Sequence, residues 1–242
     1  RITANVDKVT EDTGKYTWWR KGPTASDFVH EDVTPNFFRR SIAHIKERSE
    51  QDAPFFLYLA LPSPHTPIQP TPQWQGKSGI NPYADFMMQI DDYVGQVMDT
   101  VRAQGIEENT IIVFTSDNGC SPQADFPFII KWPLKIAASS VSNTTISLTD
   151  LMATCADLLN VPLKDNEAED SFSLVPLFDA NETTSYLREA TIHHSINGSF
   201  AIRKGNYKLI FAPDSGGWSY PIPGKDDVSD LPKYQLYDLA AD

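Results

Sequence analysis

The feature that most constrains the fold is an almost continuous apolar run at residues 54–61, with the sequence PFFLYLAL. A run of this length, bounded by proline, is typical of a parallel β-strand whose two faces are both covered. Residues 109–116, NTIIVFTS, form a second such run, and a segment with helical periodicity precedes each of them. The order helix, strand, helix, strand predicts an α/β domain, whose ligand sites lie beyond the carboxyl ends of the strands.

The two helices that precede these strands have recognisable ends. Thr34-Pro35 and Asn81-Pro82 each place a capping side chain before a proline, which is tolerated in the first helical turn. We expect the first helix to run to about Ser49. The second carries the longest apolar stripe of the chain and ends before Gly105, a typical residue just past a helix terminus.

Beyond about residue 161 the sequence changes character and becomes richer in Gly, Pro, Tyr and Trp. Strand-like segments occur at 190–194, 199–203 and 207–211, and Lys204-Gly205-Asn206 forms a hairpin turn between the last two. We therefore expect residues 1–160 to belong to an α/β domain. Residues 161–242 form a smaller α+β subdomain with antiparallel strands.

Composition excludes two classes of function. The chain has 20 Lys and Arg against 32 Asp and Glu, a formal charge of -12, which argues against nucleic-acid binding because that needs a basic face. No run of about 18 apolar residues occurs, so we expect no membrane span. Two cysteines are too few for a disulfide framework, and the sequence indicates no oligomeric state.

Asp117 and Asn118 are the first candidate site residues, because they directly follow the predicted strand at 109–116. Two oxygen-bearing side chains at a strand end, with Gly119 relaxing the backbone, could both reach a hard cation such as Ca²⁺ or Mg²⁺. The alternative is a simple turn, since Asp and Asn readily bond their own backbone there. Two ligands also leave most of the about six to eight positions of a Ca²⁺ site unfilled.

Three histidines are further candidates. His65 lies in a proline-rich loop just past the run at 54–61, where an imidazole could bind an anion or transfer a proton. A partly exposed loop histidine without a role is the alternative. His193 and His194 are adjacent near the end of a predicted strand, so alternation sends one ring to each face and at most one can line a pocket.

These segments, taken together, carry a family resemblance. The runs PFFLYLALPSPHTPIQP, YADFMMQIDDYVGQV and GIEENTIIVFTSDNG resemble the type I sulfatases, the arylsulfatase-like members of the alkaline phosphatase superfamily. Further similarity lies in WWRKGPTASDFVHEDVTP upstream, and in PFIIKWP, TDLMATCADLL, SFAIRKGNYKLI and YQLYDL downstream. The resemblance covers most of the chain in the family's order, and it implies an alkaline-phosphatase-like sheet sandwiched by helices.

The resemblance also implies chemistry. Asp117 and Asn118 match the family's strand-end metal ligands, usually for Ca²⁺, with Mg²⁺ as the alternative. His65 matches the histidine that contacts the sulfate and the leaving oxygen, and His193 or His194 would border the substrate pocket. The implied reaction is hydrolysis of a sulfate ester on a sulfated glycan or aryl compound. Most family members are exported to the periplasm, lysosome or exterior, which is the localisation we expect.

Important family features are missing from this sequence. The nucleophile, a formylglycine made within a C/S-x-P-x-R motif, has no counterpart, and neither do an accompanying Asp pair and a catalytic lysine expected between Phe126 and Pro127. We interpret the chain as the C-terminal part of a sulfatase whose parent carries these features, and expect it to be inactive alone. Two alternatives stay open: a truncated non-catalytic protein that binds metal or sulfated glycan, and a phosphodiesterase of the same superfamily.

Overall fold

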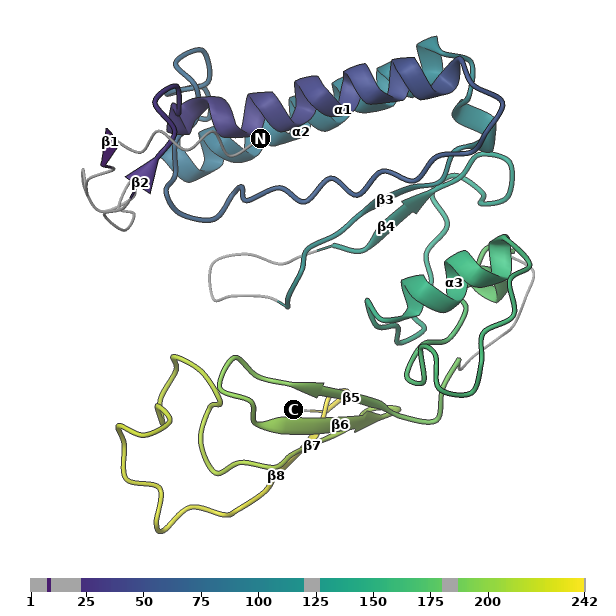
Figure 1. Cartoon of the computed structure of the whole chain (residues 1–242). Helices are drawn as coiled ribbons and strands as arrows, with labels where there is room; N and C mark the ends of the chain where they lie inside the picture. Colours follow the sequence, from purple (N-terminus) through teal and green to yellow (C-terminus); the bar gives the residue numbers. More distant parts are fainter. Residues whose placement is uncertain (1–7, 10–22, 120–126, 180–186, 242) are drawn as a thin grey trace. The chain divides into compact units, whose positions relative to one another are not determined.

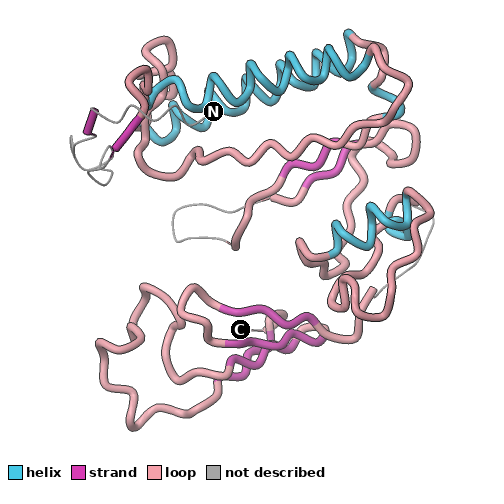
Figure 2. The backbone as a smooth tube through the Cα atoms, in the orientation of Figure 1, coloured by secondary structure: helices cyan, strands magenta, loops and turns pink. Residues whose placement is uncertain are grey.

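The computed structural model describes residues 8–9, 23–119, 127–179 and 187–241. It divides into two compact units, one made of Arg1–Ile112 with Trp132–Leu134 and the other of Val113–Lys131 with Lys135–Asp242. Both contain helices or turns of helix together with short strands (Figures 1 and 2). None of the helices in the described ranges is long and apolar enough to cross a membrane.

The first unit is built on two long helices that lie side by side (Figure 1). Phe38 and Ile45 of the first helix and Phe86 and Ile90 of the second are each at most 5% exposed. The Phe38 ring also lies 5.1 Å from that of Tyr93. The elements of this unit are β1 (Lys8–Val9), β2 (Pro23–Thr24), η1 (His30–Asp32), α1 (Val33–Ser49), α2 (Pro82–Ala103) and η2 (Glu107–Asn109).

The second helix has the ends that its sequence predicts, whereas the first begins differently. The Asn81 side chain accepts a hydrogen bond of 2.9 Å from the backbone N–H of Ala84, and Gly105 adopts a φ of 71° beyond the last turn of α2. In α1, however, Asp32 occupies the capping position and Thr34 is already helical. The Thr34 hydroxyl lies 2.6 Å from that of Ser63 and so connects α1 to the loop that contains His65.

The apolar run at 54–61 is not a strand, and our expectation that both its faces are buried is wrong for this chain. Its side chains alternate between half-buried and exposed, and Phe56 and Tyr58 are 80% and 76% exposed. No hydrogen bond joins its backbone to any residue in the described ranges. The physical reason is that a strand needs a neighbouring strand, and the described residues supply none here.

The second unit combines a strand pair, one helix and a four-stranded sheet (Figure 2). The strand pair places residues 112–114 beside 129–131, and its first strand lies within the strand that the sequence predicts at 109–116. Its first strand straddles the boundary between the units. The elements are β3 (Ile112–Phe114), β4 (Ile129–Lys131), α3 (Asp150–Leu158), η3 (Val175–Leu177), β5 (Thr191–His194), β6 (Phe200–Lys204), β7 (Tyr207–Ile210) and β8 (Gln235–Asp238).

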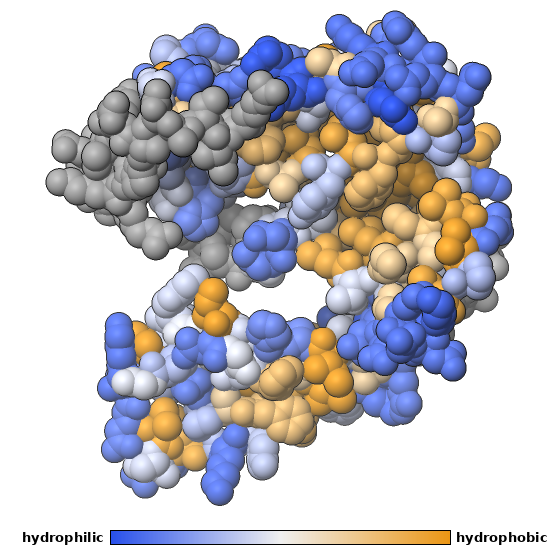
Figure 3. Space-filling view, viewed as in Figure 1, coloured by the Kyte–Doolittle hydropathy of each residue, from blue (hydrophilic) through white to orange (hydrophobic). Residues whose placement is uncertain are grey.

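The four-stranded sheet is antiparallel throughout, in the order β5-β6-β7-β8. The predicted hairpin is confirmed, because Lys204 pairs with Tyr207 and Gly205 takes a φ of 58° in the turn. Ile192, Ile202, Leu209 and Leu236 stand opposite one another and form an apolar row across all four strands. Ile192 and Leu236 are 67% and 68% exposed, and apolar residues gather over this sheet in the surface view (Figure 3).

Candidate active site

Asp117 and Asn118 lie where the sequence predicts, in an exposed segment just past β3. The Asp117 carboxylate accepts one long hydrogen bond of 3.4 Å, from the Ser116 hydroxyl. Its oxygens are therefore free to bind a cation, as a hard-metal site requires. The residues 120–126 that follow lie outside the described ranges, and within those ranges no group of three or more His, Cys, Asp or Glu could hold a metal.

His65 lies in the first unit, exposed, in the loop that follows the apolar run. Its backbone N–H donates to the carbonyl of Pro62 at 3.2 Å, which closes a turn. Its ring Nδ1 lies 2.8 Å from the carbonyl oxygen of Thr66. Because a carbonyl can only accept, Nδ1 donates in this contact, and the Thr66 hydroxyl also lies 3.2 Å from Nδ1. Nε2 makes no hydrogen bond to a described residue and is the ring nitrogen left for a ligand.

His193 and His194 occupy β5, and their rings point to opposite faces of the sheet, as alternation predicts. The Nδ1 of His194 donates to the Ser195 carbonyl at 2.8 Å, and its ring meets that of Phe200 edge-on at 6.0 Å. Burial, and then the positive charges of Lys208 and Arg203, lower the pKa of His193. His193 is therefore neutral at pH 7 and lies among cations, whereas His194 belongs to the apolar face.

The candidate residues fall in different parts of the chain. His65 belongs to the first unit, and Asp117, Asn118 and both histidines of β5 belong to the second. Within the second unit, no hydrogen bond or ion pair of the described residues joins Asp117 or Asn118 to His193 or His194. The structure thus supplies the local geometry of each candidate, and their roles stay predictions.

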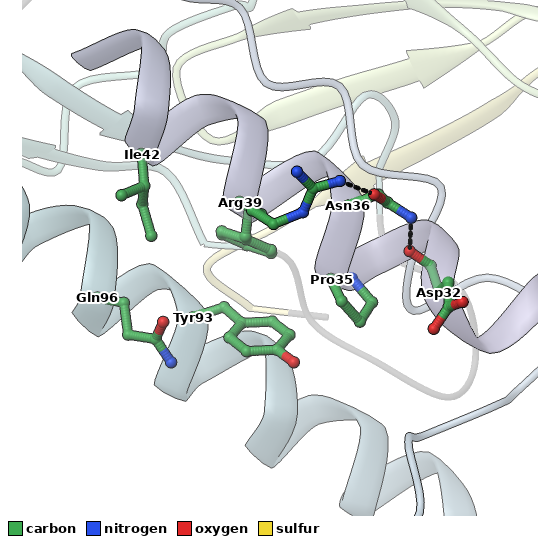
Figure 4. Close-up of a pocket in the computed structure, with 8 residues that line it drawn as sticks. Asp32, Pro35, Asn36, Arg39, Ile42, Tyr93 and Gln96 are labelled. Carbon is green, nitrogen blue, oxygen red and sulfur yellow. Dashed lines mark hydrogen bonds between the residues drawn. The ribbon is translucent and has the colours of Figure 1, made fainter. Parts of the chain in front are cut away.

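A cavity in the first unit contains none of the candidate residues. It has a volume of about 520 Å³ and lies between α1 and α2 (Figure 4). Its polar groups satisfy one another, because Asn36 donates to the Asp32 carbonyl at 2.9 Å and accepts from Arg39. The residues that line it are Asp32, Pro35, Asn36, Phe38, Arg39, Ile42, Tyr93 and Gln96.

A buried ion pair between Asp150 and Arg188 is the most enclosed polar feature of the second unit, and sequence reasoning missed it. The two side chains are 0% and 7% exposed. The Asp150 carboxylate also accepts the backbone N–H groups of Ser147 and Phe172 at 2.7 and 3.0 Å. No local motif signals this pair, because its partners lie 38 residues apart in the sequence. The acidic first residue of α3 was the only indication.

Comparison with known proteins identifies the family. The sulfatase family model matches residues 3–161, more than half of the chain. The chain is 29% identical to an N-acetylgalactosamine-6-O-sulfatase of Bacteroides thetaiotaomicron, over 93% of this chain and 48% of that protein. It is also 29% identical to human arylsulfatase A, over 81% of this chain and 44% of the relative.

The solved structures agree with the sequence relatives. A structure described under the metabolism of multiple glycosaminoglycans by Bacteroides thetaiotaomicron superposes with a TM-score of 0.76 and 28% identity, over 91% of this chain and 51% of that one. This confirms the mixed α/β fold of the superfamily, with its antiparallel C-terminal strands. The chain spans about half the length of the relatives it matches. With a family model over residues 3–161 and a shared fold, the chain belongs to the sulfatase family.

Proposed function

We propose that this chain supplies metal-binding and sulfate-contacting residues to a sulfatase, a protein that hydrolyses sulfate esters on a sulfated carbohydrate or aryl compound. The observation that carries the proposal is the family match over residues 3–161, which includes both His65 and the Asp117-Asn118 pair. The free carboxylate oxygens just past β3 support it, because they suit a hard divalent cation.

Each residue has a role in this proposal. Asp117 and Asn118 bind Ca²⁺, or Mg²⁺ as the alternative, through their side-chain oxygens. When bound, the cation neutralises charge that develops on the sulfate oxygens. His65 contacts the sulfate and the leaving oxygen through Nε2, because its Nδ1 proton is held by the Thr66 carbonyl. His193 borders the substrate, where the neighbouring cations favour an anionic glycan.

The nucleophile cannot come from the residues present here. No C/S-x-P-x-R motif exists in the sequence. In this proposal the formylglycine that the family uses belongs to a longer parent protein. We therefore propose that the 242-residue chain alone does not turn over sulfate esters. We also propose that residues 1–160 complete an α/β catalytic domain, that residues 161–242 form its C-terminal subdomain, and that the protein is exported.

The first experiment is the intact mass of the protein purified from its natural source. A mass near 27.1 kDa means that the chain works without a nucleophile of its own, and the non-catalytic alternative is then preferred. A mass near twice that value supports the sulfatase. N-acetylgalactosamine 6-sulfate is the first substrate to assay, since several relatives are named for it. A phosphodiester assayed in parallel tests the remaining alternative.

The metal assignment is tested in the same natural protein with Asp117→Ala. We expect loss of bound divalent metal and a fall in kcat of about 100-fold or more, because a carboxylate ligand is removed. Asp165→Ala is the matched control, since Asp165 is exposed and makes no polar contact in the described structure. An Asp117→Ala protein with full metal content and activity would refute the assignment.

A further inference from the structure

Two cations stand directly opposite each other on one face of the C-terminal sheet. The register pairs Thr191 with Arg203, and Arg203 with Lys208, so the three side chains form one row. Side chains that pair directly across antiparallel strands have their Cβ atoms about 5 Å apart, and like charges at that distance repel. Arg203 and Lys208 are both half-buried, which limits the screening of this repulsion by water.

Neither cation has a counter-charge among the described residues. The Arg203 Nε donates to the Gly205 carbonyl at 3.0 Å, in the hairpin turn, and Lys208 makes no hydrogen bond or ion pair. Two other basic residues of this unit, Arg188 and Lys204, do have a counter-charge. Arg188 is paired with Asp150, and Lys204 with Glu189. Of these four described cations, only Arg203 and Lys208 therefore lack a carboxylate partner.

A small cavity opens beside Arg203, and a buried donor without a partner lies in its wall. The cavity has a volume of about 30 Å³, enough for one water-sized group. Arg188 lines it, with a side chain only 7% exposed, and its Nε is buried and has no hydrogen-bond partner. A buried N–H donor normally has a hydrogen-bond acceptor, and the described residues supply none for the Arg188 Nε–H. The lining residues are Thr144, Thr145, Leu187, Arg188, Glu189, Ala190, Thr191, Arg203 and Gly205.

The one carboxylate in the cavity wall does not provide that acceptor. Glu189 is bound to Lys204, and its side chain is 82% exposed. The three threonines bring hydroxyl groups that donate readily to an anion. His193, on the same face as the cation row, is held neutral by burial and by Lys208 and Arg203, so the positive potential reaches its ring.

We propose that this cavity and the Arg203 and Lys208 row bind an oxyanion group, which we call the oxyanion site. One oxygen accepts from the Arg188 Nε–H inside the cavity, and the others face Arg203 in the cavity wall. Lys208, opposite Arg203 in the register, adds positive charge nearby. The bound group is a sulfate or a sugar carboxylate, both of which present several oxygen acceptors. It belongs either to a glycan or to free inorganic sulfate. The glycan source rests on the proposed function, whereas anion binding here requires no turnover, so its failure and a failure of sulfatase activity can be told apart.

The experiment follows the arginine side-chain N–H signals of the ¹⁵N-labelled 242-residue chain by NMR. Inorganic sulfate and methyl glucuronide, a sugar carboxylate without sulfate, are titrated separately, with chloride holding the ionic strength constant. We expect a saturable shift of the Arg188 Nε–H signal with at least one probe. Lys208→Gln should weaken that binding about tenfold, because one positive charge beside Arg203 is lost.

Two further variants make the result decisive. Lys208→Arg keeps the charge and should retain binding, which separates the loss of charge from misfolding. Lys233→Gln removes an exposed lysine of the loop before β8 and should leave binding unchanged. A response to sulfate alone identifies free sulfate or a sulfate ester, and a response to the glucuronide alone identifies a glycan carboxylate. No saturable shift would show that the cavity holds only water. Equal affinity in Lys208→Gln would show that the Arg203 and Lys208 row takes no part in binding, and either result would overturn the oxyanion site.

Discussion

Residues 54–61 and the β6–β7 hairpin are both read from the sequence as strands, yet only the hairpin forms a ladder. Arg203 and Lys208 pair because Gly205 turns the chain back within a few residues, so the neighbour is supplied locally. The run at 54–61 is more apolar, but no described residue hydrogen-bonds its backbone, and Phe56 is 80% exposed. Apolar content thus indicates that a segment can be a strand, and a neighbouring strand decides whether it is one.

The largest effect is expected in the buried polar centre of the second unit. This centre is the ion pair of Asp150 and Arg188, together with the backbone N–H groups that Asp150 accepts. Asp150→Ala leaves the Arg188 guanidinium buried without its carboxylate and frees two backbone N–H groups. The loss should be about 3–5 kcal/mol in the free energy of unfolding. Hydrogen exchange at the amides of Ala153 and Leu174 reports it, because both are hydrogen-bonded beside this centre.

The control for this prediction is an exposed ion pair in the same unit. Lys164 and Glu167 lie 3.1 Å apart with 78% and 41% of their side chains exposed. Glu167→Ala should leave the free energy of unfolding nearly unchanged, as is usual for exposed ion pairs. Equal effects of Asp150→Ala and Glu167→Ala would mean that the centre around Asp150 opens to water in solution.

A smaller, pH-dependent effect is expected in the first unit, in the loop that leads from the apolar run to α2. The backbone N–H groups of Ser78 and Gly76 donate to the Asp85 carboxylate at 2.7 and 2.8 Å. Hydrogen bonding by the Ser78 side chain lowers the pKa of Asp85 most, and the backbone N–H groups of Ser78 and Gly76 lower it further. The stabilisation is therefore fully present above the unfolded pKa of about 3.9 and is lost as the pH falls through the lower folded value.

Comparison of the wild type with Asp85→Asn tests the direction of this pH dependence of stability. The variant should be less stable at pH 7, and the two unfolding curves should converge as the pH falls below about 4. Asp91→Asn, on the exposed face of α2, is the control and should follow the wild type throughout. A difference that grows toward low pH would contradict the assignment of Asp85 as a hydrogen-bonded carboxylate.

How much of the structure could be predicted from sequence depends on how local each feature is. The cap of α2 at Asn81 and the hairpin turn at Gly205 were predicted correctly, since both are decided by a few adjacent residues. The pairing of Asp150 with Arg188 was not, because it depends on tertiary packing of distant segments. Thr34 was misassigned as a cap for the same reason, since its hydroxyl contacts Ser63 in another loop.

For the candidate site too, the features set by adjacent residues are predictable and those set by distant residues are not. The sequence alone locates Asp117 and Asn118 just past a strand, and the structure agrees. The cation row of Arg203 and Lys208 could not be recognised in the sequence, where the two lie at different positions of a hairpin and only the strand register brings them opposite. Register depends on the turn and on both faces of the sheet, so a pattern along one strand does not reveal it.

The smallest effect is expected in the apolar run, and it tests whether residues 54–61 lack a neighbouring strand. Phe56→Ser should change the stability of the 242-residue chain by less than about 0.5 kcal/mol, because an 80% exposed side chain loses little on truncation. Phe38→Ala is the contrast, since Phe38 is 2% exposed and should cost about 3–5 kcal/mol. A large loss in Phe56→Ser, measured by urea unfolding, would mean that the face of 54–61 is covered in solution. The apolar run would then be a true strand whose neighbour lies outside the described residues. It would differ from the hairpin only in how far along the chain its neighbouring strand lies.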